Sequence, residues 1–392
     1  MNRNVARWIP AVLAPAIIAA TAFGVSASAN AEVVLPDKSA SQILQFINTN
    51  QNIAFSGQVT KVANLGLPNI NLIPNISQSV VDQMNKNLPK GMSDFIPKVT
   101  VEDSITSILG FLSGTQNANI YVDGLKAERI QMLDPMSERD FIHNGTDLWY
   151  YDAGKQTVSH HTLTAAEQAP ESPSPTFDTS KLPFDINSPA SVADYFINQA
   201  GVNTTFTVGR AARVGGRDAY TLTMTPKSAG SLVESVTLSI DGANGLPLGV
   251  TVKAVGQSSP AFELAFTSIN FATPDASIFA FTPPAGTKVT EIATPANSMP
   301  AASTQTAATA ADQAELNKLK AEGWSAVVEV PAAEAAPVLA AIKENTLYAA
   351  LTKPVAGGRI FGTALLNVLI TDDGRIFAGA VTPQTLLEAA AR

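Results

Sequence analysis

The sequence feature that most constrains the fold is a close series of short β-strand patterns separated by tight turns. Five of them follow one another between residues 118 and 163. The turn at Asn144-Gly145 is the strongest hairpin signal in the series. Strands joined by such short turns run antiparallel to their neighbours. We therefore expect an antiparallel meander over five segments, Ala118–Val122, Lys126–Leu133, Glu138–His143, Asp147–Tyr151 and Thr157–Leu163.

Further strand patterns lie on both sides of this meander. One covers Gln51–Val62, and five more lie between residues 204 and 271. About ten strands in one sheet curve strongly, and the concave side needs side chains to fill it. Three apolar segments are candidates, namely the predicted helices Ser39–Asn48 and Pro189–Gln199 and the proline-interrupted loop Leu65–Ile76. The expected fold class is α+β, with short helices plugging the concave face of a large curved antiparallel sheet.

The first 31 residues have the three parts of a secretory signal peptide. Arg3 and Arg7 precede an apolar run at residues 9–25, and Ala29-Asn30-Ala31 provides a small-x-small cleavage site. The alternative is an uncleaved N-terminal anchor, because the run is just long enough to span a bilayer. Both interpretations place the bulk of the protein outside the cytoplasm, either secreted or associated with the cell envelope.

The remainder of the chain divides at a linker. Residues 291–312 are rich in Ala, Thr, Ser and Pro, which is typical of a linker. We therefore expect one domain at residues 32–290 and a small α/β extension at residues 313–392. The extension contains a predicted hairpin of Arg359–Thr371 with Arg375–Val381, as well as helices. Packing of the extension on the open edge of the large sheet would protect that edge from association.

The composition excludes several classes of function. With 25 Lys and Arg against 33 Asp and Glu, the net charge of the chain is −8. A basic nucleic-acid-binding face is therefore not expected. The absence of cysteine excludes disulfides, thiolate zinc sites and cysteine nucleophiles. We expect no metal and no cofactor.

The histidines give little material for catalysis or metal binding. The chain has only three. His160 and His161 are neighbours on a predicted strand, so their side chains point to opposite faces. The predicted turns place His143 on the same face as His160, at about 12 Å, which is too far for a shared metal ion. Few polar groups converge elsewhere, and this argues against an enzyme.

Apolar side chains on the concave side are the remaining candidates for a binding site. If they fill the concavity completely, they form an ordinary core. If they fill it partly, the remaining cavity accommodates an acyl chain, which gains about 0.8 kcal/mol per buried methylene without any polar contact. The residues alone leave both interpretations open. The candidate cavity residues are Phe55, Leu65, Leu67, Ile70, Leu72, Ile73, Trp149 and Tyr151.

Several short segments between residues 40 and 290 follow one another in a distinctive order. The segments are Phe55-Ser56-Gly57-Gln58-Val59, Val122-Asp123-Gly124, His143-Asn144-Gly145 with Trp149-Tyr150-Tyr151-Asp152, Val214-Gly215-Gly216-Arg217-Asp218, Gly245-Leu246-Pro247-Leu248 and Phe279-Ala280-Phe281-Thr282-Pro283-Pro284. In this order they resemble the LolA-like and RseB-like extracytoplasmic lipoprotein-carrier superfamily, in particular its actinobacterial LolA-family members. The resemblance implies a half-open antiparallel barrel over residues 32–290, an apolar cavity for acyl chains of lipids or lipoproteins, and no catalysis. One departure is the lack of a cysteine, which excludes the lipoprotein anchor of many mycobacterial relatives.

Three functions therefore remain open. The first is a monomeric carrier of lipids or lipoproteins, with a membrane protein as a further candidate partner. The second is a regulatory sensor of the RseB kind, which binds an anti-sigma factor through its tail or a sheet edge. The third is a secreted enzyme, which the scarcity of polar constellations disfavours.

Overall fold

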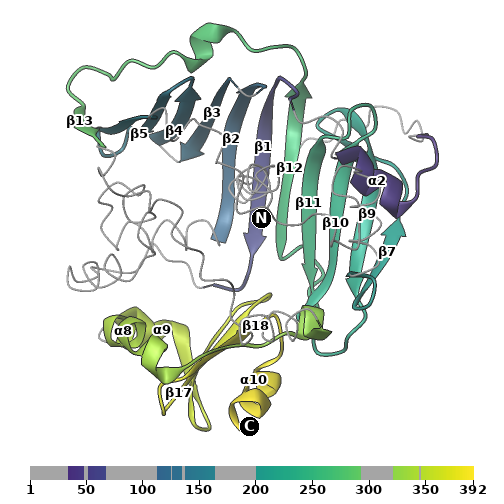
Figure 1. The fold of residues 1–392 in the computed structure, drawn as a ribbon, viewed down its shortest axis with the longest axis vertical. Coiled ribbons are helices and arrows are strands. Elements are labelled where there is room, and N and C mark those ends of the chain that lie inside the picture. The colour runs from purple at the N-terminus through teal and green to yellow at the C-terminus, as the bar shows by residue number, and fades with distance from the viewer. Residues whose placement is uncertain are drawn as a thin grey trace, which may run out of the picture.

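The computed structural model describes residues 34–47, 52–67, 113–124, 126–134, 137–163, 200–292, 321–343 and 346–392. In this part of the chain, thirteen strands form one large sheet and five strands form a second, smaller sheet (Figure 1). The order of the large sheet is β13-β6-β5-β4-β3-β2-β1-β12-β11-β10-β9-β7, and β8 pairs with β9. Its two end strands, β13 and β7, do not pair with each other, so the sheet is open.

The five strands of the predicted meander are confirmed as β2 to β6, each paired antiparallel with the next. The strand predicted at Gln51–Val62 is β1, which lies between β2 and β12 and joins the two halves of the sheet. The first half of the sheet consists of β1 (Phe55–Asn64), β2 (Ser113–Asp123), β3 (Ala127–Asp134), β4 (Ser137–Asn144), β5 (Asp147–Asp152) and β6 (Thr157–Thr162).

The second half follows the second run of strand patterns. Gly215 and Gly216, both with positive φ (57° and 80°), form the turn between β8 and β9, a conformation that glycine adopts without steric cost. The strands of this half are β7 (Thr204–Val208), β8 (Ala212–Val214), β9 (Arg217–Pro226), β10 (Val233–Asp241), β11 (Pro247–Ala254) and β12 (Phe262–Asn270).

One strand departs from the expected antiparallel sheet. After β12, the short 3₁₀ helix η4 (Ala276–Phe279) leads to β13 (Lys288–Glu291), which pairs parallel with β6. The sheet is therefore mixed, and the expectation of a purely antiparallel sheet is wrong at this edge. No turn connects β13 to β6, because 125 residues lie between Thr162 and Lys288. Because no turn joins the two strands, no local pattern in the sequence predicts that they pair.

The large sheet curls toward one face, which we call the concave face. β8 contacts β12 although β9, β10 and β11 lie between them in the sheet. The predicted helix Ser39–Asn48 is confirmed as α2 (Ala40–Ile47), and its Ile43 packs against Tyr220, Leu222 and Ile240. Cross-strand pairing places Leu222 on the same face as Leu264 and Val59. One short helix therefore covers the concave face of the second half, as expected.

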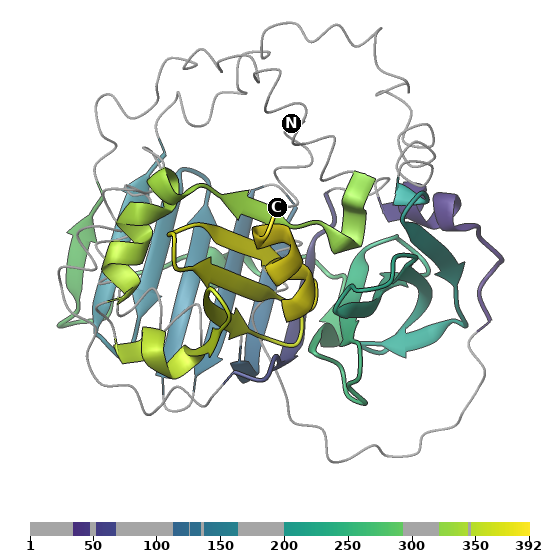
Figure 2. The same ribbon diagram turned by 90° about the horizontal axis from the view of Figure 1, so that it is seen from below.

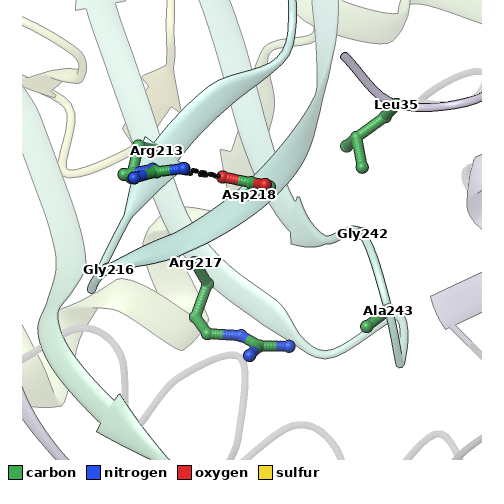
Figure 3. A pocket seen from close by; sticks show the side chains of 7 residues that line it. All are labelled: Leu35, Arg213, Gly216, Arg217, Asp218, Gly242 and Ala243. Atoms are coloured by element: carbon green, nitrogen blue, oxygen red, sulfur yellow. Dashed lines mark hydrogen bonds and ion pairs between the residues drawn. The ribbon is translucent and has the colours of Figure 1, made fainter. Parts of the chain in front are cut away.

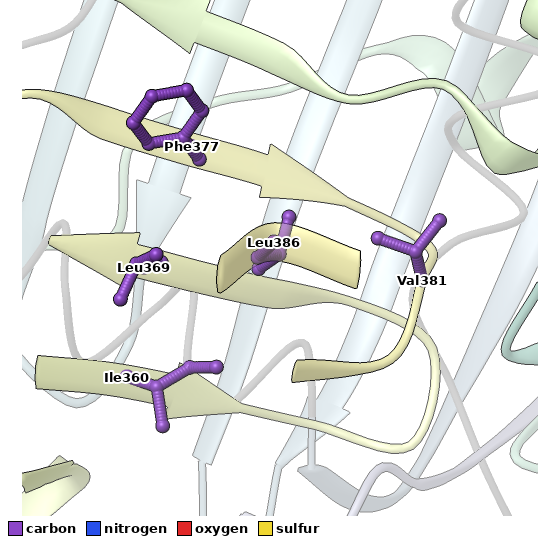
Figure 4. Close-up of a cluster of buried hydrophobic side chains, with 5 residues drawn as sticks. All are labelled: Ile360, Leu369, Phe377, Val381 and Leu386. Carbon is purple, nitrogen blue, oxygen red and sulfur yellow. The ribbon is translucent and has the colours of Figure 1, made fainter. Parts of the chain in front are cut away.

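The C-terminal extension is a second unit with its own core (Figure 4). Its sheet, in the order β14-β18-β17-β16-β15, carries α10 on one face and α8 on the other. Leu386 of α10 packs on Ile360, Leu369 and Phe377. The elements are η5 (Gly323–Ser325), β14 (Val328–Val330), α8 (Ala332–Lys343), α9 (Thr346–Leu351), β15 (Thr352–Val355), β16 (Gly358–Gly362), β17 (Asn367–Thr371), β18 (Ile376–Gly379) and α10 (Pro383–Ala390).

The hairpin expected in the extension is partly wrong. The segment predicted as one strand, Arg359–Thr371, is two antiparallel strands, β16 and β17. The Thr363 hydroxyl accepts hydrogen bonds from the backbone N–H groups of Leu365 and Leu366 (3.3 and 2.9 Å). Such side-chain to backbone bonds favour a turn over a continuous strand.

The extension contacts the ends of several strands of the large sheet, as the view from below shows (Figure 2). The N–H of Leu232 donates to the carbonyl of Ala380 (2.7 Å), and the N–H of Ala364 donates to that of Leu65 (2.9 Å). The indole N–H of Trp324 donates to the Thr204 hydroxyl (2.8 Å). The extension therefore does not run along the open edge of the large sheet, and that expectation is wrong.

Several expectations lie outside the described residues. These are the signal peptide, the helix Pro189–Gln199 and the loop Leu65–Ile76 beyond residue 67. Within the described residues, no helix is long and apolar enough to cross a membrane.

Candidate functional site

A continuous row of apolar side chains crosses the concave face of the first half of the sheet. Ile120 of β2 lies directly opposite Ile130 of β3, which lies opposite Phe141 of β4, which lies opposite Tyr150 of β5. Directly opposite side chains on neighbouring strands are about 5 Å apart. These four side chains, which we call the apolar row, therefore form one band about 14 Å long, at about 4.8 Å per strand.

The four side chains of the apolar row differ in how much of each is exposed to solvent. Ile120, Ile130 and Tyr150 are half-buried, and Phe141 is 37% exposed. Burial raises the pKa of the Tyr150 hydroxyl, which keeps this phenol neutral. An exposed phenylalanine beside half-buried aliphatic side chains is a surface that an apolar ligand can cover.

Between the apolar row and the second half of the sheet, the concave face carries small and closely packed residues. Gly57 lies opposite Ile120, and a Cβ atom at Gly57 would lie 2.7 Å from the ring of Phe266. Ala118 is fully buried and packs with Val59 and Leu264. The concave face is therefore filled at β12 and β1 and more open across β3 to β5.

A buried cation lies on the same face beside this filled region. Lys61 is fully buried, and its Nζ donates to the carbonyl oxygen of Ser113 (3.0 Å) and to Gln116 Oε1 (3.3 Å). Burial lowers the pKa of Lys61 from 10.5 to about 8, because removal from water disfavours the charged form.

Two groups of the predicted cavity residues lie at the ends of the concave face. Phe55 packs edge-on against Phe266 and Phe271, with ring centroids 5.7 and 6.5 Å away. Leu65 and Leu67 pack with residues of β11, the β11–β12 turn and the extension at the opposite end of β1. Phe55 therefore belongs to one packed cluster, and Leu65 and Leu67 belong to another.

The two predicted aromatic residues of β5 lie on the other face of the sheet. Trp149 lies opposite Ile142, whereas Tyr150 lies opposite Phe141, so Trp149 and Tyr151 point away from the apolar row. Both rings contact Phe281, at centroid distances of 5.4 and 5.8 Å. Ile70, Leu72 and Ile73, the other three predicted cavity residues, lie outside the described residues.

His160 is the centre of a polar cluster on this outer face. Its ring stacks on Trp149, its Nε2 lies 2.9 Å from Asp147 Oδ1, and its Nδ1 lies 2.8 Å from Glu291 Oε2. The hydrogen bond with His160 lowers the pKa of Asp147. His143 lies opposite Leu148, which lies opposite His161, so His143 shares a face with His161.

The expectation that His143 and His160 share a face is therefore wrong, because the four-residue turn 153–156 sets a different register from the one assumed. Among the described residues, no group of three or more His, Asp and Glu side chains is arranged to hold a metal ion.

A small surface pocket lies beside the β8–β9 turn, with Leu35, Gly242 and Ala243 among its lining residues (Figure 3). Its two guanidinium groups already have carboxylate partners. Arg213 pairs with Asp218, and Arg217 pairs with the buried carboxylate of Asp241, both at 2.7 Å. Asp241 raises the pKa of Arg217 further. We assign no ligand to this pocket.

The apolar row was missed by the sequence analysis. The selection there followed residue type and favoured Trp149 and Tyr151. The alternation of side chains along the strands indicates the apolar row better than residue type does. A two-residue turn between Asn144 and Asp147 places Phe141 and Tyr150 on the same face of the sheet.

No protein-family model matches the sequence, and no curated protein is significantly similar to it. The fold is similar to that of several solved structures at low sequence identity. MucB of Pseudomonas aeruginosa in complex with MucA is 13% identical, with 90% of this chain and 96% of that chain covered and a TM-score of 0.38. A LolA superfamily protein, NE2245 of Nitrosomonas europaea, is 12% identical, with 62% and 99% covered and a TM-score of 0.20. An uncharacterized conserved protein of Thermus thermophilus is 11% identical, with 65% and 99% covered and a TM-score of 0.31.

Proposed function

We propose that the protein is an extracytoplasmic, non-enzymatic carrier of lipids or lipoproteins that holds acyl chains against its concave face. The observation that carries this proposal is the apolar row of Ile120, Ile130, Phe141 and Tyr150, which are in register across four strands. An acyl chain lying across the row removes methylene groups from water at about 0.8 kcal/mol each. Binding of this kind needs no polar side chain.

The N-terminal sequence supports the location that this function requires. A positive start, an apolar run and a small-residue cleavage site form a secretory leader. A carrier outside the cytoplasm meets acylated molecules that have left the membrane and need shelter from water. The leader and the apolar row are thus two independent features that fit one function.

The test uses the full chain, expressed in a bacterium with its own leader and purified from the extracytoplasmic fraction. Native mass spectra and extraction with organic solvent would identify a bound lipid. We expect an acyl-bearing ligand in stoichiometric amount. A ligand-free mass, together with no uptake of added lipids or acylated peptides, would contradict the proposal and favour a protein-binding role.

A matched pair of variants localises the binding. Phe141 and Leu133 are both 37% exposed and lie on neighbouring strands, but Leu133 is on the outer face. Phe141→Asp places a charge in the apolar row, and we expect the ligand to be lost. Leu133→Asp places the same charge on the other face, and the ligand should be retained. Equal retention in both variants would place the ligand elsewhere.

A further inference from the structure

The segment between β12 and the linker, residues 272–292, forms a strap across the outer face of the first half of the sheet. It is the green segment that runs from β12 to β13 in Figure 1. Its first part is firmly held, because Arg129 Nη1 donates to the carbonyl of Ile278 (3.1 Å) and Asn144 Nδ2 donates to that of Phe279 (3.3 Å). The Phe279 side chain is 3% exposed.

The second part of the strap, β13, is held much less firmly. It has four residues, all of them exposed, and it forms the only parallel pair among the described strands. Parallel pairing is slightly weaker per residue than antiparallel pairing. Few buried apolar contacts and exposed backbone hydrogen bonds mark a segment that opens locally. β13 therefore covers the β6 edge with little stability of its own.

The β6 edge, in contrast, carries a largely buried histidine with two carboxylate partners. His160 is 13% exposed, whereas the Glu291 side chain that it contacts is 69% exposed. Both ring nitrogens of His160 face carboxylate oxygens, those of Asp147 and Glu291. His161 Nδ1 lies 2.9 Å from the carbonyl oxygen of Ile292. The edge thus offers backbone pairing together with an imidazole that contacts a carboxylate.

We propose that the β6 edge is a docking site for an extended segment of another protein that carries a carboxylate at the position of Glu291, and that β13 occupies this site in the free protein. An incoming strand would pair parallel to β6, as β13 does, and place a carboxylate against His160. Addition of a strand to a sheet edge derives affinity from main-chain hydrogen bonds and specificity from side chains. This proposal does not depend on lipid binding at the concave face.

Hydrogen exchange of the wild-type full chain tests whether β13 opens. We expect the amides of residues 288–291 to exchange at least tenfold faster than those of β4, in the middle of the same half of the sheet. Exchange of β13 as slow as that of β4 would overturn the proposal, because a permanently closed edge cannot accept a partner.

Binding of the strap sequence itself tests whether the edge accepts a strand from outside. The probe is a fluorescein-labelled peptide of residues 286–293, Gly-Thr-Lys-Val-Thr-Glu-Ile-Ala. In the wild type, β13 competes with the peptide at the millimolar effective concentration of a tethered segment. Lys288 and Ile292 donate their N–H groups to the carbonyls of Gln156 and His160, so the N–H of Thr290, at the alternate position between them, also faces β6. Thr290→Pro removes this donor, and this full-chain variant should bind the peptide at least tenfold more tightly than the wild type. A peptide with Gln in place of Glu291 should bind several-fold more weakly.

A second variant keeps the result interpretable if proline disturbs the fold. Glu291→Lys retains every backbone donor and reverses the charge that faces His160, so it should also release β13 and increase peptide binding. Circular dichroism would confirm that both variants are folded. If neither folded variant binds the peptide more tightly than the wild type, the β6 edge is not a docking site.

Discussion

The indole of Trp149 and the imidazole of His160 are stacked, with ring centroids 3.7 Å apart and ring planes 14° from parallel. They lie directly opposite each other on β5 and β6. The imidazole therefore covers one face of the indole and shields it from water.

Replacement of His160 by Ala should expose Trp149. We expect the tryptophan emission to shift to longer wavelength and the free energy of unfolding to fall by about 1 kcal/mol, the scale of one aromatic pair. His143→Ala is the control, because His143 lies on the opposite face of the sheet. The other tryptophans are the same in both variants, so they cancel in the difference spectrum. An equal shift in both variants would contradict the stacking.

Lys61 should make stability depend on pH in the alkaline range. Its pKa is about 8 in the folded protein, against an ordinary lysine value of 10.5 in the unfolded chain. Between these values the unfolded state binds more protons, so stability rises as the pH increases from 8 to 10.5. At about 1.4 kcal/mol per pKa unit, the rise is on the order of 3 kcal/mol.

The variant Lys61→Met should therefore be more stable than the wild type at pH 7 and should lack this rise. Urea unfolding at several pH values would measure it. Lys253→Met, at an exposed lysine of β11, is the matched control. The prediction fails if the two variants show the same dependence on pH.

Gly57 should be intolerant of a side chain. A Cβ atom there would lie 2.7 Å from the Phe266 ring and 2.8 Å from the backbone oxygen of Ser268. We expect Gly57→Ala to lower the free energy of unfolding by about 1–3 kcal/mol, as overpacking does. At Gly154 the nearest atom is a side-chain oxygen of Ser137, at 3.0 Å, which can move. Gly154→Ala should therefore lower the free energy of unfolding less than Gly57→Ala does, as measured by thermal unfolding. A larger loss for Gly154→Ala than for Gly57→Ala would contradict this packing.

Leu386 should control the stability of the C-terminal unit. It is fully buried against Ile360, Leu369 and Phe377. Leu386→Ala creates a cavity and should cost about 2–5 kcal/mol. Hydrogen exchange should become faster in β16, β17 and β18 and stay unchanged in β2 to β5. The exposed Glu388→Ala on the same helix should leave both regions unaffected; uniform loss of protection would mean that the two units unfold together.

The turns of the meander are sufficient to predict β2 to β6 from the sequence, because short connections leave few ways of pairing. The pairing of β13 with β6 could not be predicted in this way, since no turn joins them. The break between β16 and β17 depends on the Thr363 hydroxyl, which local alternation of apolar residues does not reveal. For the candidate site, alternation indicates that Tyr150 and Trp149 point to opposite faces. It does not indicate which face is concave, because that follows from the contact between β8 and β12.

The central position of β1 has a consequence for biogenesis. β1 pairs with β2 on one side and with β12 on the other, and about 200 residues separate Asn64 from Phe262. At 5–20 residues synthesised per second, roughly 10–40 s pass between the appearance of β1 and that of β12. During this interval one edge of β1 has no partner from its own chain. A strand with partners on both sides in the finished sheet therefore has one open edge while the chain is being made, and a chaperone would protect that edge.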